Sequence, residues 1–368
     1  MLNYKAIVIG AGPAGIGMTI ALNQFGIKDT LIIEKEYIGS TFQKWPVTTK
    51  FITPSFTTNG FGMPDINAIT PDTSPAYTFK KEHISGKEYQ EYLQAVSSIY
   101  ELNINENTCV NHIEKVNDIF KIYTNNGTFN AKYLFVATGD FNFPYKPFEI
   151  GQHYSEINNF EDVTSSEVTV LGANESGIDS AINLAELGKK VTIITKTTGY
   201  DSNIADPSIS LSPYTSERFK TVLKKGYPIR LLTNREVSSI QAHDNGYKIH
   251  FNNHKDHILT EEVIQATGFL PTKNPLIQSL FEIKNNEIHL TSEDESTRFN
   301  NIFLTGSVIE NEDAILCYIY KFRARFAVLA SILCSREKIK VSEDMIDYYK
   351  RNQMFLDDYS CCEVKCTC

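Results

Sequence analysis

Apolar residues in this chain occur either in short continuous runs, which are typical of buried strands, or at helical spacing. The first run, Lys5–Ile9, leads directly into a glycine-rich turn, Gly10-x-Gly12-x-x-Gly15, and apolar residues at helical spacing follow. This order predicts a strand, a tight turn and a helix. Another apolar run, Thr30–Glu34, predicts the next strand. A strand, a helix and a strand in succession favour an α/β fold with a parallel sheet.

The remainder of the first half combines one long irregular stretch with shorter elements. Residues 47–81 show no regular period, and a loop of that length within a domain is usually functional. Ser85 is placed to cap a helix that we expect to reach about Glu101. Three strands are predicted after it, at Cys109–Val116, Phe120–Tyr123 and Thr128–Val136. The last strand ends in Ala137-Thr138-Gly139, where small residues would let a cofactor approach the backbone.

The pattern of strand, turn and helix returns in the second half. Residues 140–165 are polar and proline-rich, and we interpret them as a linker. A strand from Val168 then leads into Gly172-Ala-Asn174-Glu175-Ser176-Gly177 and a helix, and Lys190–Thr197 is the next strand. Two later strands, Glu262–Gln265 and Asn301–Thr305, stop at Ala266-Thr267-Gly268 and at Gly306-Ser307.

These repeats predict an α/β protein with two Rossmann-like dinucleotide-binding domains, the second inserted into the first. The expected boundaries are residues 1–163 and 274–368 for the first domain and 164–273 for the second. Two helices should follow the last strand. One is expected from about Asp313 to Cys334, with Glu312 and Asp313 suiting its N-terminal dipole, and the other from a Ser342 cap to about Met354.

The first glycine turn has the residue types that a diphosphate requires. Gly10 permits the turn, Gly12 lets the backbone come close to a pyrophosphate, and Gly15 lets the helix pack on the strand. The unpaired N–H groups of the helix N-terminus would then point at the phosphates. Glu34, at the end of the next strand, can accept hydrogen bonds from a ribose diol.

The second turn differs from the first at two positions that bear on the nucleotide. Asn174 replaces the middle glycine, and Asn tolerates unusual φ better than most residues. Where the first unit has Glu34, the second has Lys196 between Thr195 and Thr197. A carboxylate prefers a free ribose 2′-hydroxyl, whereas a cation between two hydroxyls can hold a 2′-phosphate, which favours NADPH over NADH.

Composition narrows the class of protein. The chain has 368 residues, of which 42% are hydrophobic and 21% charged, and this suits a soluble globular protein of about two domains. A net charge of −9 does not favour nucleic acid as a partner. The apolar run 314–334 contains Lys321, Arg323 and Arg325, which a membrane span would tolerate poorly. We therefore expect a cytoplasmic protein without a membrane span, acting on a small-molecule substrate, with a homo-oligomer left open.

The cysteines fall into two groups. Cys109, Cys317 and Cys334 are scattered among apolar residues and suit reduced core thiols. The other four, Cys361, Cys362, Cys366 and Cys368, crowd the C-terminus without zinc-ribbon spacing. They could hold a soft metal ion or relay electrons as a dithiol, and the alternative is an exposed terminus without a catalytic role.

The order of these motifs resembles the flavoproteins with two dinucleotide-binding domains. Within them, Gly39-Ser40-Thr41-Phe42 followed by Trp45-Pro46 is similar to a segment of flavin-containing monooxygenases and of CzcO-like flavoproteins. The resemblance implies FAD in the first unit, bound by Gly10, Gly12, Pro13, Ala14, Gly15, Glu34, Lys35, Thr41, Phe42, Trp45, Val110, Ala137, Thr138, Gly139, Gly306 and Ser307. It implies NADPH in the second, bound by Gly172, Asn174, Glu175, Ser176, Gly177, Thr195, Lys196 and Gly268.

Departures from the family patterns separate the functional hypotheses. The related bacillithiol disulfide reductases carry a lone cysteine in the first glycine loop, where this chain has Ala14, and Ser307 stands where disulfide reductases have an aspartate. His153 is either the domain-linking histidine of the monooxygenases or a structural linker residue. The first hypothesis is therefore an NADPH-reduced, FAD-dependent monooxygenase. The alternatives are a reductase of a quinone, a metal ion or a small disulfide with the terminal cysteines as relay, and a metal-linked flavoprotein sensor.

Overall fold

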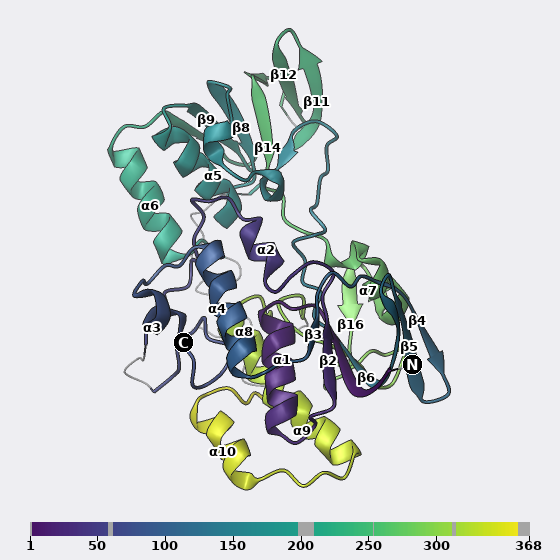
Figure 1. Cartoon of the computed structure of the whole chain (residues 1–368). Coiled ribbons are helices and arrows are strands. Elements are labelled where there is room, and N and C mark those ends of the chain that lie inside the picture. Colours follow the sequence, from purple (N-terminus) through teal and green to yellow (C-terminus); the bar gives the residue numbers. More distant parts are fainter. Residues whose placement is uncertain (1, 58–61, 198–209, 253, 311–313, 360–368) are drawn as a thin grey trace. The chain divides into compact units, whose positions relative to one another are not determined.

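The structure of the chain, a computed structural model, describes residues 2–57, 62–197, 210–252, 254–310 and 314–359 (Figure 1). The chain divides into two compact units. The first unit consists of Met1–Gln43, Pro54–Phe143 and Pro271–Cys368, and the second of Lys44–Thr53 and Pro144–Leu270. Both units combine parallel strands with helices, which confirms the predicted α/β class.

The unit boundaries differ from the predicted ones at residues 163/164 and 273/274. Most of the expected linker belongs to the second unit, because Gln152–His153 forms strand β7 and pairs with Glu262–Gln265 (β14) of that unit. The short segment Lys44–Thr53 belongs there too. Thr49 Oγ1 donates to the Asp179 carboxylate at 2.8 Å, so a partly buried hydrogen bond holds the segment in place.

The first unit is built on a sheet with strand order β3-β2-β1-β6-β5-β4, and β17 also pairs with β6. Its strands are β1 (Leu2–Ile9), β2 (Thr30–Ile33), β3 (Ile104–Asn105), β4 (Val110–Val116), β5 (Ile119–Thr124), β6 (Gly127–Val136) and β17 (Ile302–Leu304). Strand β6 is long enough to pair antiparallel with β5 in its first half and parallel with β17 in its second. The carboxyl ends of β1, β2, β6 and β17 therefore meet at one edge of the sheet.

Helices surround this sheet, and small residues set how closely the first of them packs. The helices are α1 (Pro13–Gln24), α2 (Ser40–Gln43), α3 (Pro75–Phe79), α4 (Gly86–Ile99), α7 (Pro275–Leu280), α8 (Ile319–Phe322), α9 (Phe326–Arg336) and α10 (Glu343–Arg351), with 3₁₀ turns η3 (Pro271–Lys273) and η4 (Arg323–Arg325). A hairpin of β15 (Glu282–Lys284) and β16 (Glu287–His289) completes the unit. Helix α1 packs against α9 so closely that a Cβ at Gly17 would lie 2.2 Å from the Phe326 ring (Figure 1).

The second unit has a parallel sheet of order β10-β9-β8-β14-β7 and an antiparallel sheet of order β11-β12-β13. Its elements are β7, η1 (Tyr154–Glu156), η2 (Phe160–Asp162), β8 (Glu167–Leu171), α5 (Glu175–Glu186), β9 (Lys190–Ile194), α6 (Pro213–Lys224), β10 (Ile229–Leu232), β11 (Val237–His243), β12 (Gly246–Phe251), β13 (His257–Thr260) and β14. One apolar cluster joins the parallel sheet to α5 and α6, and a smaller one joins it to the antiparallel sheet. The sheet is thus covered on both faces, as parallel sheets require.

The predicted C-terminal helices form with different limits. The predicted start of the first helix, Asp313 with Glu312, lies outside the described residues. Ile315 instead pairs antiparallel with Glu310, and the helical stretch starts at Ile319 and continues through η4 to Arg336. The second begins after Ser342, whose side chain makes no capping hydrogen bond, and ends at Arg351 rather than near Met354. The Ser85 cap is present with its full capping box, and that helix ends two residues before the predicted Glu101.

Candidate nucleotide-binding sites

The first glycine turn has the close contacts that its spacing predicts. The Gly10 N–H donates to Ile33 O at 2.8 Å, and φ at Gly10 is 112°, a conformation that favours glycine. A Cβ at Gly10 would lie 2.4 Å from Ala137 O, and one at Gly15 would lie 1.9 Å from Gly10 O. Gly12 is different, because nothing in the protein lies within 4 Å of a Cβ built there. The fold thus requires glycine at two positions and leaves the space beside the third for a ligand.

Glu34 ties the glycine turn to the end of the neighbouring strand, β2. Its Oε2 accepts the Ala11 N–H at 2.7 Å, and its Oε1 accepts the Glu36 N–H at 2.9 Å. Burial raises the pKa of Glu34 even though both backbone hydrogen bonds favour the carboxylate. Each oxygen retains a further lone pair for a ribose hydroxyl. Lys35 lies beside it with an exposed ammonium group 3.8 Å from Glu36.

The other residues predicted to bind FAD gather at the same sheet edge, with one exception. The Gly39 N–H donates to Ala11 O, which brings Thr41 and Phe42 of α2 toward the turn. The Thr108 N–H donates to Glu34 O, which brings the start of β4 at Val110 alongside. Trp45 instead belongs to the second unit, where its ring lies 5.1 Å from that of Phe51. Direct contact of these residues with FAD stays a prediction.

Residues from β6 and β17 complete the edge. Ala137, Thr138 and Gly139 follow β6, and Gly306 and Ser307 follow β17 after one intervening residue, Thr305. Gly306, with φ 108°, approaches Ala14 so closely that a Cβ at 306 would lie 2.9 Å from the Ala14 Cβ. The neighbouring Pro13 is the first residue of α1. Ala14, in the first turn of α1, is therefore packed against the backbone that follows β17.

The second unit repeats the geometry of the first turn. The Gly172 N–H donates to Ile194 O at 2.8 Å, and φ at Gly172 is 111°. A Cβ at Gly172 would lie 2.2 Å from Ala266 O, and one at Gly177 would lie 2.1 Å from Gly172 O. The Ser180 hydroxyl donates a hydrogen bond to the backbone carbonyl of Ser176, in the first turn of α5. Two turns of matching shape therefore stand at the carboxyl edges of two parallel sheets.

The structure shows the backbone of Asn174 and the side-chain contacts of Glu175, while their contact with NADPH stays a prediction. Asn174 has φ −92°, close to the −84° of Gly12, so the turn requires no unusual φ there. Its exposed side chain makes no capping hydrogen bond and stands where Gly12 leaves open space. The Glu175 carboxylate accepts the Ser212 N–H and the Thr215 hydroxyl, at 2.6 Å for the latter, so it fixes the start of α6. Sequence alone could not show this contact, because it joins residues far apart in the chain.

The end of β9 presents the predicted cation. Thr195 Oγ1 lies 3.1 Å from Thr197 Oγ1 and also accepts the Thr197 N–H, so the two hydroxyls are held together. Lys196 between them is exposed, and it forms no ion pair within the described part of the chain. A free ammonium group beside two hydroxyls at this edge can bind a phosphate.

Two residues hold the turns at these sites in place, His153, whose role the sequence analysis left open, and Asn274, which it did not name. His153 is 1% exposed; its Nδ1 accepts the Ser155 N–H at 3.2 Å, so its Nε2–H donates to Gly268 O at 3.1 Å. It thereby fixes the turn after β14, which assigns it a structural role inside the second unit. Asn274 Nδ2 donates to Thr138 Oγ1 at 2.9 Å in the first unit. Only its place before Pro275, typical of a helix N-cap, was visible in the sequence.

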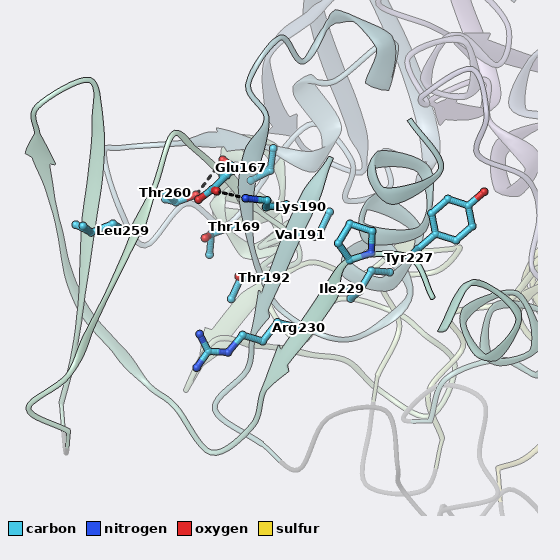
Figure 2. Close-up of a pocket in the computed structure, with 12 residues that line it drawn as sticks. Glu167, Thr169, Lys190, Val191, Thr192, Tyr227, Ile229, Arg230, Leu259 and Thr260 are labelled. Carbon is cyan, nitrogen blue, oxygen red and sulfur yellow. Dashed lines mark hydrogen bonds and ion pairs between the residues drawn. The ribbon is translucent and has the colours of Figure 1, made fainter. Parts of the chain in front are cut away.

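A pocket in the second unit lies away from this edge (Figure 2). It has a volume of about 370 Å³ and is lined at the amino ends of β8, β9 and β10, where Glu167 and Lys190 form an ion pair at 2.9 Å. The glycine turn follows the carboxyl end of β8, so the pocket belongs to the opposite edge of the sheet. It is therefore not part of the nucleotide site.

Cysteines, metals and membranes add three observations. Cys109 and Cys317 are exposed and only Cys334 is buried, so the expectation of three core thiols is wrong for two. Cys361, Cys362, Cys366 and Cys368 lie outside the described residues, and elsewhere in the described chain no cluster of His, Cys, Asp and Glu is arranged to hold a metal ion. None of the described helices is both long and apolar enough to cross a bilayer.

Comparisons with known proteins confirm the resemblance. Residues 7–306 match the family described as pyridine nucleotide-disulphide oxidoreductase. Bacilliredoxin reductase Bdr from Bacillus subtilis is 25% identical over 92% of this chain and 99% of its own length. An uncharacterized CzcO-like oxidoreductase from Geobacillus kaustophilus is 30% identical over 49% of this chain and 51% of its own. A flavin-containing monooxygenase from Stenotrophomonas maltophilia shares the fold, with a TM-score of 0.72 at 14% identity over 91% of this chain and 99% of that one.

The cofactors of this group fit the residues on both edges. FAD with NAD(P)H as the reductant is the cofactor set that the family and fold imply, as expected from the sequence. Three features of the first unit suit a dinucleotide with a free ribose diol. They are the open space at Gly12, the Glu34 carboxylate that accepts two backbone hydrogen bonds, and the small residues after β6. Discrimination between NADPH and NADH rests on Lys196 and is taken up below.

Proposed function

We propose, because this chain belongs to the pyridine nucleotide-disulphide oxidoreductase family, that it is an NADPH-reduced, FAD-dependent monooxygenase of a small organic substrate. Bound FAD would supply the redox chemistry, the acceptance of a hydride from the nicotinamide and the reduction of oxygen. The overall reaction consumes substrate, O₂, NADPH and one proton, and yields oxygenated substrate, water and NADP⁺. The second candidate is a reductase that uses the same reductant.

The observation that carries the oxygenase proposal concerns the position of thiols. A disulfide reductase needs a cysteine within reach of the flavin. Position 14 is Ala14, buried against Gly306, so a thiol at this point of the glycine turn is replaced by a methyl group. Of the cysteines in the described ranges, Cys334 lies at the other end of α1, where its Sγ contacts Phe25 O at 3.3 Å, whereas Cys109 is exposed and directly precedes Val110. The oxygenase proposal therefore rests on the missing thiol at position 14.

The chain's own residues supply binding and placement. Gly10, Gly12 and Gly15 shape the diphosphate turn, and the N–H groups at the start of α1 face it. The Glu34 carboxylate orients the ribose while it holds the Ala11 N–H. In the second unit, His153 fixes Gly268, and the Thr195 and Thr197 hydroxyls flank Lys196 at the phosphate position. These interactions bind and orient, which is the part of catalysis that the protein contributes in a cofactor enzyme.

The reaction class can be tested with isotopic oxygen. Purified holoprotein would be incubated with NADPH, ¹⁸O₂ and a panel of thioethers, amines and ketones, and products examined by mass spectrometry. We expect one ¹⁸O atom in a product, with NADPH consumption that stops under nitrogen. Continued NADPH oxidation under nitrogen with a quinone or a small disulfide as acceptor, and no labelled product, would overturn the oxygenase in favour of the reductase.

The reductase candidate has its own support. The relative that matches over 92% of the chain and 99% of its own length is named as a reductase of bacilliredoxin. A reductase would need an acceptor that takes two electrons directly from the flavin or through a thiol other than one at position 14. The anaerobic arm of the same experiment detects it.

The choice of NADPH over NADH is tested separately by Lys196→Ala. Removing the ammonium group that faces a 2′-phosphate should raise the KM for NADPH about tenfold or more, since hydrogen bonds to charged groups contribute ~1.5–3 kcal/mol. The KM for NADH should change little. Lys190→Ala is the matched control, because Lys190 lies at the opposite end of the same strand and pairs with Glu167. Equal loss for both nucleotides would remove Lys196 from the proposal.

A further inference from the structure

The resemblance between the two units extends beyond their glycine turns to the backbone after the next two strands. In the first unit, three hydrogen bonds join the segments that follow β2 and β3. The Glu34 N–H donates to Asn105 O at 2.9 Å, the Thr108 N–H to Glu34 O at 2.8 Å, and the Asn107 N–H to Glu36 O at 2.7 Å.

The second unit has the same three bonds in the same order. The Thr195 N–H donates to Leu232 O at 3.0 Å, the Arg235 N–H to Thr195 O at 2.9 Å, and the Asn234 N–H to Thr197 O at 2.9 Å. The backbone conformation repeats too, since Asn107 has φ 50° and Asn234 has φ 53°. Asn107 and Asn234 therefore occupy equivalent positions.

The equivalence continues into the hairpins that follow. The pairing of β4 with β5 is irregular between Val110 and His112, and that of β11 with β12 is irregular between Val237 and Ser239. Val237 thus takes the place of Val110, and Lys196 takes the place of Lys35. Thr195 therefore corresponds to Glu34, and the expectation that Lys196 stands in the place of Glu34 is wrong by one residue. The two units can be compared residue by residue at the adenosine end of each nucleotide.

This comparison places Asn234 beside the cation of the second unit. Residues joined by backbone hydrogen bonds across neighbouring segments have Cα atoms roughly 5 Å apart, so Asn234 is next to Thr197 and within one residue of Lys196. Its side chain is exposed and makes no hydrogen bond within the described ranges. A phosphate held by Lys196, Thr195 and Thr197 is within the reach of its amide.

We propose that Asn234 lines the subsite for the 2′-phosphate of NADPH and, together with Lys196, determines specificity for this nucleotide. The inference rests on the proposed NADPH dependence. The amide Nδ2 donates to a phosphate oxygen, and the left-handed backbone at 234 fixes the direction in which the side chain leaves the loop. At Asn107 the neighbouring Glu34 faces a ribose without a phosphate, so the same residue type has no anion to bind there.

Binding of two small nucleotides tests this without any turnover. Titration calorimetry would compare 2′,5′-ADP, which carries the 2′-phosphate, with 5′-AMP, which lacks it, on the FAD-loaded protein. Asn234→Asp places a carboxylate beside the phosphate and should weaken 2′,5′-ADP about tenfold. Binding of 5′-AMP should change less than about twofold, because no charge faces the new carboxylate.

Two variants control for strain and for charge. Asn107→Asp makes the same change at the same backbone conformation in the first unit, and Asn245→Asp adds the same charge in the exposed turn between β11 and β12. Both should leave the preference for 2′,5′-ADP intact. Wild-type protein that prefers 2′,5′-ADP while Asn234→Asp binds it equally well would overturn the role of Asn234 alone. Wild-type protein without any preference would overturn the NADPH proposal, and this inference with it.

Discussion

Alanine substitutions at Gly12 and Gly15 should impair different properties of the first unit, although both residues belong to one motif. At Gly15 the new methyl group would lie 1.9 Å from Gly10 O and 3.3 Å from the Val8 side chain. At Gly12 it would meet nothing within 4 Å, and the φ of −84° and ψ of −174° suit alanine. We therefore expect Gly15→Ala to damage the fold and Gly12→Ala to damage only the binding of FAD.

The magnitudes follow from these contacts. Side chains essentially never come within 3.0 Å of a backbone atom in this way, so α1 must move by about 1 Å in Gly15→Ala. The helix is buried along most of its length and packed against α9, so the move resembles overpacking and should cost ~2–4 kcal/mol. For a unit of this size that lowers Tm by roughly 5–15 °C. Gly12→Ala should change the free energy of unfolding by less than about 1 kcal/mol.

The assay separates folding from binding. Thermal unfolding of the flavin-free proteins measures the first effect, and quenching of FAD fluorescence on titration measures the second. We expect FAD affinity of Gly12→Ala to fall about tenfold or more, because the methyl group takes the space that the pyrophosphate needs. Gly177→Ala is a positive control in the second unit, with its Cβ 2.1 Å from Gly172 O. Wild-type FAD affinity in Gly12→Ala, or wild-type Tm in Gly15→Ala, would refute this reasoning.

Two further predictions concern buried groups. Arg325 and Asp294 form an ion pair at 2.7 Å, and their side chains are only 1% and 2% exposed. Arg325→Met should therefore lower the free energy of unfolding, measured in urea, by ~3–5 kcal/mol. The arginine of the ion pair between Arg336 and Glu295 is 28% exposed, so Arg336→Met should lower it by only ~1 kcal/mol. Equal costs would contradict the effect of burial. Burial lowers the pKa of His153, so the unfolded chain binds this proton more readily and stability should fall as the pH drops through about 6.5. His153→Gln should show a smaller loss between pH 7.5 and 5.5, and an unchanged pH profile would exclude the histidine as its cause.

The parts of the fold that the sequence predicts well are those in which local chemistry and tertiary packing agree. The two glycine turns, the strands after them and the Ser85 capping box each combine a local conformational requirement with a periodic apolar run. The helix expected from Asp313 failed because the apolar pattern of residues 314–318 suits a strand-like bridge as well as a helix. The sequence showed Arg323 and Arg325 only as cations within an apolar run, whereas in the structure both are buried: Arg323 donates to Ala68 O and Arg325 pairs with Asp294. Such contacts join distant parts of the chain, and no local pattern encodes them.

The residues of the candidate sites also fall into two groups, those that the fold requires and those that it does not. This difference explains how one fold can serve two nucleotides. Glycines 10, 15, 172 and 177 are required by backbone contacts within the protein, so their spacing is readable from the sequence whether or not a ligand binds. The positions that would distinguish the nucleotides are those at which the two units carry different residues on the same backbone, namely Gly12 against Asn174 and Glu34 against Thr195. Asn107 and Asn234 also correspond, and only the repeated hydrogen bonds reveal it. If specificity resides in residues that the fold does not require, Glu34→Thr in the first unit and Thr195→Glu in the second should change the ribose that each unit accepts more than they change the free energy of unfolding. The Glu34 carboxylate limits that freedom in the first unit, since it also holds the Ala11 N–H, whereas Thr195 makes no equivalent bond to the second turn within the described residues. We therefore expect the second unit to be the more easily altered of the two.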